Sequence, residues 1–582
     1  MKYKVFFLLI FMALSASAKI ISLDNAKRMA VEFFQNKTSQ RIVKKLQMVY
    51  DGETEFSRSA GVSPALYVFN NPDGKGFVIV AGDDLAEPIL GYSYEHVFPE
   101  GNLPPNVEGW LCSLKKQIND GRKWGVVSKP SSRALGTTGE VVAQLKTAMW
   151  NQGYPYNQYC PVVSGEKAPT GCVITAAAIV MHYYKWPEKG TGTLPGYTTM
   201  SSNVEVPAVQ LGHVYDWDEM ILDYQSGKYT IEQGEQVSRL MADLGVMMQA
   251  DYGKYGTAAS SYYLGRLLST YMGYDKSAVR WGRSETPDEE WHQMLQQELR
   301  DGHPIVYDGH NDEYGHTFVL DGYTTKQFYS VNWGWGGYCN GYFLLNALVP
   351  EGSGIGGNGE HYNFYQSAVI GLKPDEGGDY IERMLMIGNG LSSSVEQVQK
   401  NKPFDVVVTR IENGGGTYFN GTILWALTDK NGNIKEHLAT LECKDLQPGW
   451  GWENLKKSCM VTVPIVAGDR IRMFYKSRKT PQWTLIKSGN QCTWELLVVE
   501  RSSIEALTKL RYNKKDRLWT ITSQSGVDVL LVSDTGNVLK DRCVTKGNVT
   551  TINTQGLSAG TYVIRMKNSF DSCDVRIKLG DS

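Results

Sequence analysis

The segment Thr170–Ala178, TGCVITAAA, places Cys172 at the start of an expected helix, Gly171–Lys185, which Pro187 stops. At a helix N-terminus a thiol meets unpaired backbone N–H groups and the positive end of the helix dipole, and both stabilise a thiolate. A thiolate is a nucleophile that needs a base or an imidazolium partner. A small buried cysteine in an alanine-rich core helix is the alternative that this segment alone leaves open.

Among the nine histidines, His316 is the best candidate for the partner of Cys172, because it begins an expected strand in the motif Gly315–Gly322, GHTFVLDG. The spacing 316 − 172 = 144 falls within the roughly 130–150 residues that separate the cysteine and histidine of papain-like peptidases. Sixteen residues later, Asn332 lies in the motif Val331–Gly337, VNWGWGG. Its side-chain oxygen can accept a hydrogen bond from the imidazole and orient the ring. Each residue alone fits a strand end or a turn; together, in this order, they predict nucleophilic catalysis.

Three further side chains fit the same chemistry. Gln152 lies upstream of the cysteine, and its amide can join the Cys172 backbone N–H in binding a developing oxyanion. A glutamine in an ordinary turn is the alternative. Trp333 and Trp335 follow Asn332 and can shield the histidine–asparagine bond from water.

The composition excludes several other classes of function. Fifty-nine basic residues against 61 acidic ones give a net charge of −2, so a nucleic-acid grip is not expected. The 60 glycines and 33 tyrosines indicate a turn-rich protein with much β-structure. The nine cysteines form no CxxC pair and the chain has no HExxH or P-loop, so neither a metal nor a cofactor is expected. An odd number of cysteines leaves at least one thiol outside intramolecular disulfides, and the pairing of the others stays open.

The N-terminus has the pattern of a signal peptide. Lys2 and Lys4 precede the apolar run Val5–Leu14, and the small residues Ala16 and Ala18 follow. Ten apolar residues are too few to span a bilayer, and no later segment comes close. We therefore expect an exported protein that is soluble or attached to the surface; a buried N-terminal strand is the alternative.

The remaining chain is expected to form four regions with different patterns. The first contains an amphipathic helix beginning near Ala26 and a hairpin of the strands Leu66–Phe69 and Phe77–Val80. The second, mixed α and β, contains the helix Pro287–Arg300 with Thr286 as its N-cap. After this helix come three expected strands: Ile305–Tyr307, Thr317–Leu320 and Phe328–Val331. The last two regions lose helical periodicity and are predicted to be β-sandwiches. The expected boundaries, with the signal peptide, are 1–18, 19–133, 134–373, 374–500 and 501–582.

These motifs closely resemble those of the streptopain family of secreted bacterial cysteine peptidases. The resemblance is carried by the cysteine helix, GHTFVLDG and VNWGWGG, and by Tyr362–Ala368 at the end of the catalytic region. Residues Gly76–Asp83 resemble the family's inhibitory propeptide. The implied fold is α+β: a papain-like two-lobed catalytic domain, preceded by an α+β propeptide and followed by two all-β sandwich domains. The implied protein is a secreted zymogen that hydrolyses peptide bonds and is inhibited by its own propeptide.

By position, the resemblance assigns Cys172 as nucleophile, His316 as general acid and base, Asn332 as orienting amide and Gln152 as oxyanion donor. It also implies that Thr257 and Gly315 line the peptide cleft, and we expect Trp333 and Trp335 to contribute to substrate binding as well. An aromatic residue does not follow the cysteine as it does in plant papains, so transfer of detail from those enzymes is not expected.

The C-terminal segment Gly556–Arg565 is similar to sorting domains of the Bacteroidetes type nine secretion system. That similarity implies secretion machinery as a partner and a location outside the cell or on its outer surface. Two other functions remain open. One is a transglutaminase or amidase of the papain superfamily, and the other is a surface adhesin whose catalytic domain is silent.

Overall fold

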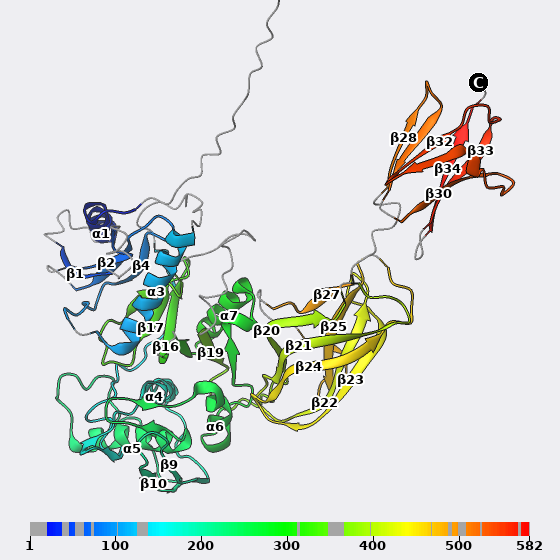
Figure 1. Ribbon diagram of the computed structural model, residues 1–582. Coiled ribbons are helices and arrows are strands. Elements are labelled where there is room, and N and C mark those ends of the chain that lie inside the picture. The colour runs from blue at the N-terminus through cyan, green and yellow to red at the C-terminus, as the bar shows by residue number, and fades with distance from the viewer. Residues whose placement is uncertain are drawn as a thin grey trace, which may run out of the picture.

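Figure 1 shows the computed structural model of the 582-residue chain. The structure describes residues 20–37, 46–52, 63–71, 75–101, 103–124, 138–310, 315–346, 366–395, 397–466, 468–486, 492–498, 508–523, 526–567 and 572–580. The expected signal peptide at 1–18 lies outside these residues. Within the described ranges, none of the helices combines the length and the apolar character that crossing a membrane requires.

The N-terminal region is a small α+β unit. Its helices α1 (Leu23–Lys37) and α3 (Pro105–Trp124) pack on the strands β1 (Gln47–Asp51), β2 (Leu66–Asn70), β3 (Phe77–Ala81) and β4 (Ile89–Ser93). The predicted first helix and the predicted β2–β3 hairpin are confirmed. Four consecutive buried residues in β2 and five in β3 explain why these strands form the centre of the unit.

A single antiparallel sheet runs from this unit through the catalytic region. Its strand order is β1-β2-β3-β4-β18-β17-β16-β15-β19-β14, and β5 pairs with the far end of β16. The catalytic strands are β5 (Val141–Gln144), β14 (Val279–Gly282), β15 (Ile305–His310), β16 (Gly315–Thr324), β17 (Tyr329–Asn332), β18 (Gly341–Phe343) and β19 (Gln366–Ile370). The three strands predicted after the long helix correspond to β15, β16 and β17, so they are confirmed.

The two faces of this sheet belong to different hydrophobic cores. Phe318 and Leu320 of β16 face the core that contains α3 and the N-terminal strands. Val319, between them, faces the core of the helical lobe, formed by α4 (Cys172–Tyr184) and α5 (Ile231–Met247). This alternation follows from the period of two along a strand. It places α4 against one face of the sheet and α3 against the other (Figure 1).

Shorter elements complete the helical lobe and its border with the sheet. The helices are α6 (Leu264–Tyr271), α7 (Asp288–Arg300), η1 (Ser261–Tyr263) and η2 (Arg283–Glu285). The two-residue strands are β6 (Val162–Val163), β7 (Glu166–Lys167), β8 (Thr193–Leu194), β9 (Tyr197–Thr198), β10 (Glu205–Val206), β11 (Val209–Gln210), β12 (Asp251–Tyr252) and β13 (Thr257–Ala258).

The predicted cap of α7 is wrong, although the helix itself is confirmed. The helix begins at Asp288, with Pro287 at the N-cap and no side-chain cap bond. Thr286 instead donates its hydroxyl to the carbonyl oxygen of Gly282, 3.1 Å away. The reason is the turn η2, which precedes the helix and takes up the hydroxyl that the sequence pattern assigned to the cap.

The region after residue 373 is all-β where it is described, and it forms the two predicted sandwiches. The first packs β20 (Met384–Ser393), β21 (Pro403–Asn413) and β24 (Gly451–Met460) against β22 (Phe419–Thr428), β23 (Ile434–Leu446), β25 (Arg470–Ser477), β26 (Thr484–Leu485) and β27 (Glu495–Leu497). The second packs β28 (Lys509–Asn513), β29 (Leu518–Thr522), β31 (Cys543–Lys546) and β32 (Val549–Asn553) against β30 (Asp528–Ser533), β33 (Gly560–Lys567) and β34 (Ser572–Leu579). The short helix η4 (Lys540–Arg542) precedes β31.

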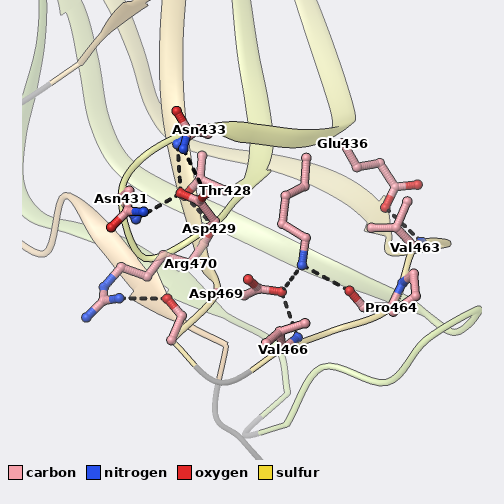
Figure 2. A network of polar contacts seen from close by, with 12 residues as sticks. Thr428, Asp429, Asn431, Asn433, Glu436, Val463, Pro464, Val466, Asp469 and Arg470 are labelled. Atoms are coloured by element: carbon pink, nitrogen blue, oxygen red, sulfur yellow. Dashed lines mark hydrogen bonds and ion pairs between the residues drawn. The ribbon is translucent and has the colours of Figure 1, made fainter.

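Polar contacts close the β22–β23 hairpin at one end of the first sandwich. Figure 2 shows Asp429 accepting hydrogen bonds from the backbone N–H groups of Asn431 (2.8 Å) and Asn433 (2.9 Å). Nearby, Lys435 donates to the buried carboxylate of Asp469 at 2.5 Å. The bonds to Asp429 are typical of an Asx turn, so they account for the position of the loop.

Candidate active site

Cys172 is the first residue of α4, as predicted. The preceding Gly171 has φ 91° and ψ 151°, a conformation that L side chains rarely adopt. A Cβ atom at Gly171 would lie 2.7 Å from the carbonyl oxygen of Thr257 in β13. Glycine is therefore required here for two reasons: it turns the chain into the helix, and it lets β13 approach the cysteine.

The net effect of its surroundings on the pKa of the Cys172 thiol is opposite to the prediction. Burial is the largest influence and raises the pKa of the thiol above its ordinary value. The backbone N–H of Val173, in the first turn of α4, lowers the pKa as the helix argument predicted, and so does the backbone N–H of Thr317. The carboxylate of Asp308 raises it further. Because burial outweighs the helix terminus, the net shift of the thiol pKa is upward.

The start of β16 meets the nucleophile, and Thr317 makes the contact. β15 and β16 pair in continuous register, with Asp308 opposite Thr317 and Gly309 opposite His316. Thr317 shares its face of the sheet with Asp308, to which it donates a hydrogen bond, and with Cys172. His316 is adjacent in sequence, so its side chain projects from the other face. The structure thus brings β16 to Cys172, and the joining of imidazole and sulfur stays a prediction.

Asn332 is the last residue of β17, and both the nitrogen and the oxygen of its side-chain amide form hydrogen bonds. Its Nδ2 donates to Thr147 Oγ1 (3.0 Å) and to the carbonyl oxygen of Ala148 (2.9 Å), while its Oδ1 accepts from the N–H of Gly334 (3.2 Å). Thr147 in turn donates to Asp321 at 2.5 Å. The predicted orienting amide is therefore itself fixed in position by a chain of hydrogen bonds.

Asp321 supports Asn332 through Thr147, and the sequence did not predict this role. Complete burial raises its pKa to about 6, and hydrogen bonds from Ser330, Thr147 and Gln144 oppose that rise. An acidic residue at the end of the apolar run Thr317–Leu320 was the only signal for it in the sequence.

Gln152 lies beside the segment that leads into Cys172. Its carbonyl oxygen accepts from the backbone N–H of Thr170 at 3.0 Å, and its own N–H donates to Asn151 Oδ1 at 2.7 Å. Gln152 is buried. This bond places Gln152 two residues from the nucleophile across the loop, which is the neighbourhood that an oxyanion donor must occupy.

Two of the residues assigned to substrate binding lie next to the segments that carry Cys172 and His316. Thr257 is buried against Gly171 and donates its hydroxyl to the carbonyl oxygen of Pro169 at 2.6 Å. Gly315 is exposed at the first position of β16. Both therefore border the segments that carry Cys172 and His316.

The positions of the two tryptophans do not match the substrate-binding role that was predicted for them. Trp333 is 1% exposed, and its ring packs 4.8 Å from that of Phe318 and 6.1 Å from that of Trp110 in α3. Its Nε1 donates to the carbonyl oxygen of Cys339 at 3.0 Å. Trp335 is half-buried and packs against the same core. While α3 covers this face, Trp333 offers no surface to a substrate.

The N-terminal unit contacts the catalytic region at β18 and near the loop that follows Trp335. Strand β4 pairs with β18, with Tyr92 opposite Tyr342, and the N–H of Leu344 donates to the carbonyl oxygen of Leu90 at 2.9 Å. The loop after Trp335 also approaches the N-terminal unit: a Cβ atom at Gly337 would lie 3.5 Å from the ring of His96. The arrangement resembles an inhibitor that extends the enzyme's own sheet.

Among the residues that the structure describes, no group of three or more His, Cys, Asp or Glu side chains is placed to hold a metal ion. The side chains described above supply a thiol, an imidazole on the adjoining strand, and amides.

A helix-borne cysteine beside a histidine strand, covered by an N-terminal α+β unit, defines the class of cysteine peptidases that carry a propeptide. Comparison with known proteins agrees. The model of the Peptidase C10 family matches residues 150–343, and the model of the Spi protease inhibitor matches residues 18–118. The chain is 36% identical to streptopain of Streptococcus pyogenes over 327 residues, which cover 53% of this chain and 81% of streptopain.

Two further proteins are similar to this chain. The thiol protease/hemagglutinin PrtT of Porphyromonas gingivalis is 32% identical over 320 residues, covering 53% of this chain and 37% of PrtT. The solved prointerpain A fragment of Prevotella intermedia is 30% identical, covers 57% of this chain and 100% of the fragment, and superposes with a TM-score of 0.46. This chain belongs to the Peptidase C10 family. It is a cysteine peptidase with an inhibitory propeptide.

Proposed function

We propose that the chain is a secreted endopeptidase that cleaves extended protein segments with Cys172 as nucleophile and His316 as general acid and base. The observation that carries the assignment is the contact between the first residue of α4 and the start of β16. It brings together the two segments that supply, in the predicted order, a thiol at a helix N-terminus and a neighbouring imidazole. Their match to the Peptidase C10 family supports the same roles.

In the proposed mechanism, the Cys172 thiolate attacks the scissile carbonyl carbon. The developing oxyanion is bound by the Cys172 backbone N–H and the Gln152 amide. His316 donates a proton to the leaving amine, and water then hydrolyses the acyl-enzyme. Asn332, held through Thr147 and Asp321, orients the imidazole.

Activation requires two changes to the arrangement seen here. Residues 19–133 must leave the site, since α3 covers one face of the sheet next to it and β4 pairs with β18 of the catalytic region. The side chain of His316 must also turn from that face toward Cys172, so that imidazolium and thiolate form an ion pair. Removal of the propeptide frees the face on which His316 lies, so we expect the first change to permit the second.

The substrate preference and the role of the C-terminal segment are proposed from the resemblance to known families. A bulky apolar residue at the substrate's second position before the cut is expected near the loop that contains Thr257. Gly556–Arg565, which forms a turn and most of β33, is proposed as part of a sorting domain that the secretion machinery binds. Secretion by a Bacteroidetes host of the full chain, but not of a chain ending at residue 500, would support that role; equal amounts of both in the medium would contradict it.

The main test compares residues 19–582 with and without the nucleophile. The Cys172→Ala variant should lose self-cleavage, casein hydrolysis and labelling by a thiol-directed epoxide. Cys112→Ala is the matched control, because Cys112 is a half-buried thiol of α3 that leaves with the propeptide. Equal processing of the wild-type and Cys172→Ala chains would contradict the proposal. Amine transfer without hydrolysis would favour a transglutaminase, and binding of host protein without either reaction would favour an adhesin.

A further inference from the structure

The segment 257–263, which runs from β13 through η1, is fastened to the catalytic region at two points. Thr257 donates its hydroxyl to the carbonyl oxygen of Pro169 at 2.6 Å, in the segment that leads into α4. Four residues later, Ser261 donates to the buried carboxylate of Asp308 in β15 at 2.5 Å. The segment therefore spans from the start of the nucleophile helix to the central sheet.

Tyr262 supplies a third attachment, which leads out of the catalytic region into the first sandwich. Its hydroxyl donates to the carbonyl oxygen of Asn413, the last residue of β21, at 3.4 Å. A Cβ atom at Gly449 would lie 3.0 Å from the ring of Tyr262, so a residue without a side chain lets this turn rest against the ring. On the catalytic side, the guanidinium of Arg280 lies 5.5 Å from the ring centroid. The ring is thus held between the two regions.

Asn413 organises the part of the sandwich that contacts Tyr262. Its Nδ2 donates to the carbonyl oxygens of Thr417 (2.8 Å) and Leu446 (2.9 Å), and its Oδ1 accepts from the N–H of Gly415 (2.9 Å). Its carbonyl oxygen, which receives the Tyr262 hydroxyl, also accepts from the N–H of Gly449 at 2.7 Å. Asn413 is 1% exposed. One buried side chain therefore holds together the turns on which Tyr262 rests.

The connection between the catalytic region and the first sandwich is also bound in place. The side chain of Asp275 accepts from the backbone N–H groups of Glu376 (3.1 Å) and Gly378 (3.0 Å). Further along, the guanidinium of Arg383 lies 3.8 Å from the centroid of the Trp281 ring, and β20 contacts η2. Figure 1 shows the sandwich against this side of the catalytic region. Its position is therefore fixed, as a support for the segment 257–263 requires.

We propose that the first β-sandwich is a working part of the peptidase, and that Tyr262 is a positioning residue through which it holds the segment 257–263 in shape for the substrate. This inference rests on the proposed endopeptidase function and on the expected place of Thr257 in the peptide cleft. A segment that is already ordered loses less conformational entropy when a substrate binds. Loosening its third attachment should therefore weaken substrate binding and leave the chemical step unchanged.

The first test measures kinetics of the mature enzyme with the sandwich attached, on a peptide that has leucine at the second position before the cut. Tyr262→Ala should raise KM about tenfold and keep kcat within about twofold of wild type. Tyr262→Phe keeps the ring against Gly449 and should keep KM within about twofold. Alkylation of Cys172 by iodoacetamide should proceed at the wild-type rate in both, because this small reagent does not need the segment. A fall in kcat with KM unchanged, or slower alkylation, would overturn the proposal.

The second test perturbs the segment from the sandwich, about 150 residues away in sequence (413 − 262 = 151). In the full-length chain, Asn413→Ala should speed amide hydrogen exchange of residues 257–263, and in the mature enzyme it should raise KM. Asn433→Ala is the matched control, because Asn433 donates to Asp429 at 2.8 Å in the hairpin after the opposite end of β22 (Figure 2). It should leave both measurements at wild-type values.

Combining the substitutions shows whether they act on one contact. KM of the double variant Asn413→Ala/Tyr262→Ala should equal that of Tyr262→Ala, whereas multiplied effects would overturn the proposal. Unchanged exchange of residues 257–263 in Asn413→Ala would also overturn it; if that variant does not fold, the Tyr262 variants decide, since they leave the sandwich intact. Hydrogen exchange requires no hydrolysis, so a failure of the proposed function appears separately, as a wild-type enzyme that cleaves no peptide.

Discussion

Gly341 opens β18 where the propeptide strand β4 joins the catalytic sheet, and we predict that Gly341→Ala weakens latency without harming the mature enzyme. A Cβ atom at Gly341 would lie well under 3.0 Å from the carbonyl oxygen of Tyr92 and 3.1 Å from the Cβ of Ser93. Both neighbours belong to the propeptide. The clash therefore exists only while the propeptide is docked.

The size of the effect follows from the cost of overpacking. Backbone atoms cannot yield as the end of a flexible side chain can, so the added methyl group should cost about 1–3 kcal/mol of docking free energy. Since about 1.4 kcal/mol corresponds to a factor of ten, the open form of the zymogen should be populated roughly 5–150 times more often. Strand pairing at Tyr92–Tyr342 should loosen first.

The assay follows casein hydrolysis and self-cleavage after the zymogen is diluted into activating conditions. Gly341→Ala should shorten the lag by a similar factor, while mature enzyme prepared from it should keep the wild-type kcat/KM. Hydrogen exchange of residues 89–93 in the Cys172→Ala background should become faster. Gly560→Ala in β33 is the control, because its Cβ would meet only a ring atom of Tyr562, at 3.9 Å. An unchanged lag with unchanged exchange would refute the reasoning, as would equal damage to zymogen and mature enzyme.

Three further perturbations test other parts of the structure. Arg122→Ala should destabilise the zymogen by about 3–5 kcal/mol in denaturant unfolding, because it leaves the buried carboxylate of Asp83, now 2.7 Å from Arg122 Nε, without its cationic partner; a loss below about 1 kcal/mol would contradict this. Arg383→Ala should cost a similar amount, since Arg383 of the segment before β20 reaches across to Glu285, 3.3 Å away in the catalytic region; equal unfolding midpoints of the two chains would contradict it. Burial lowers the pKa of His292 to about 4, so its contribution to stability is complete above about pH 6.5 and should fall by about 3 kcal/mol as the pH drops through 4. His292→Gln should remove that part of the pH dependence, and an identical profile for both chains would show that another group is responsible.

The sequence alone predicted the elements that depend on local patterns. Gly171–Lys185 was recognisable as a helix with Cys172 at its start, and β15, β16 and β17 as strands, because periodicity and stop signals act over a few residues. The spacing of Cys172, His316 and Asn332 predicted which segments would meet. The local pattern at Thr286 failed, because a neighbouring turn competed for the same hydroxyl.

The tertiary structure decided what depends on distant neighbours. The pairing of Tyr92 with Tyr342 joins residues 250 positions apart (342 − 92 = 250), and local patterns do not specify such a partner. The same is true of the pKa of the nucleophile. The helix N-terminus was visible in the sequence and favours a thiolate, yet the burial around Cys172 and the carboxylate of Asp308 reverse the balance. Desolvation is a property of everything that packs around a group, and it exists only once the chain has folded.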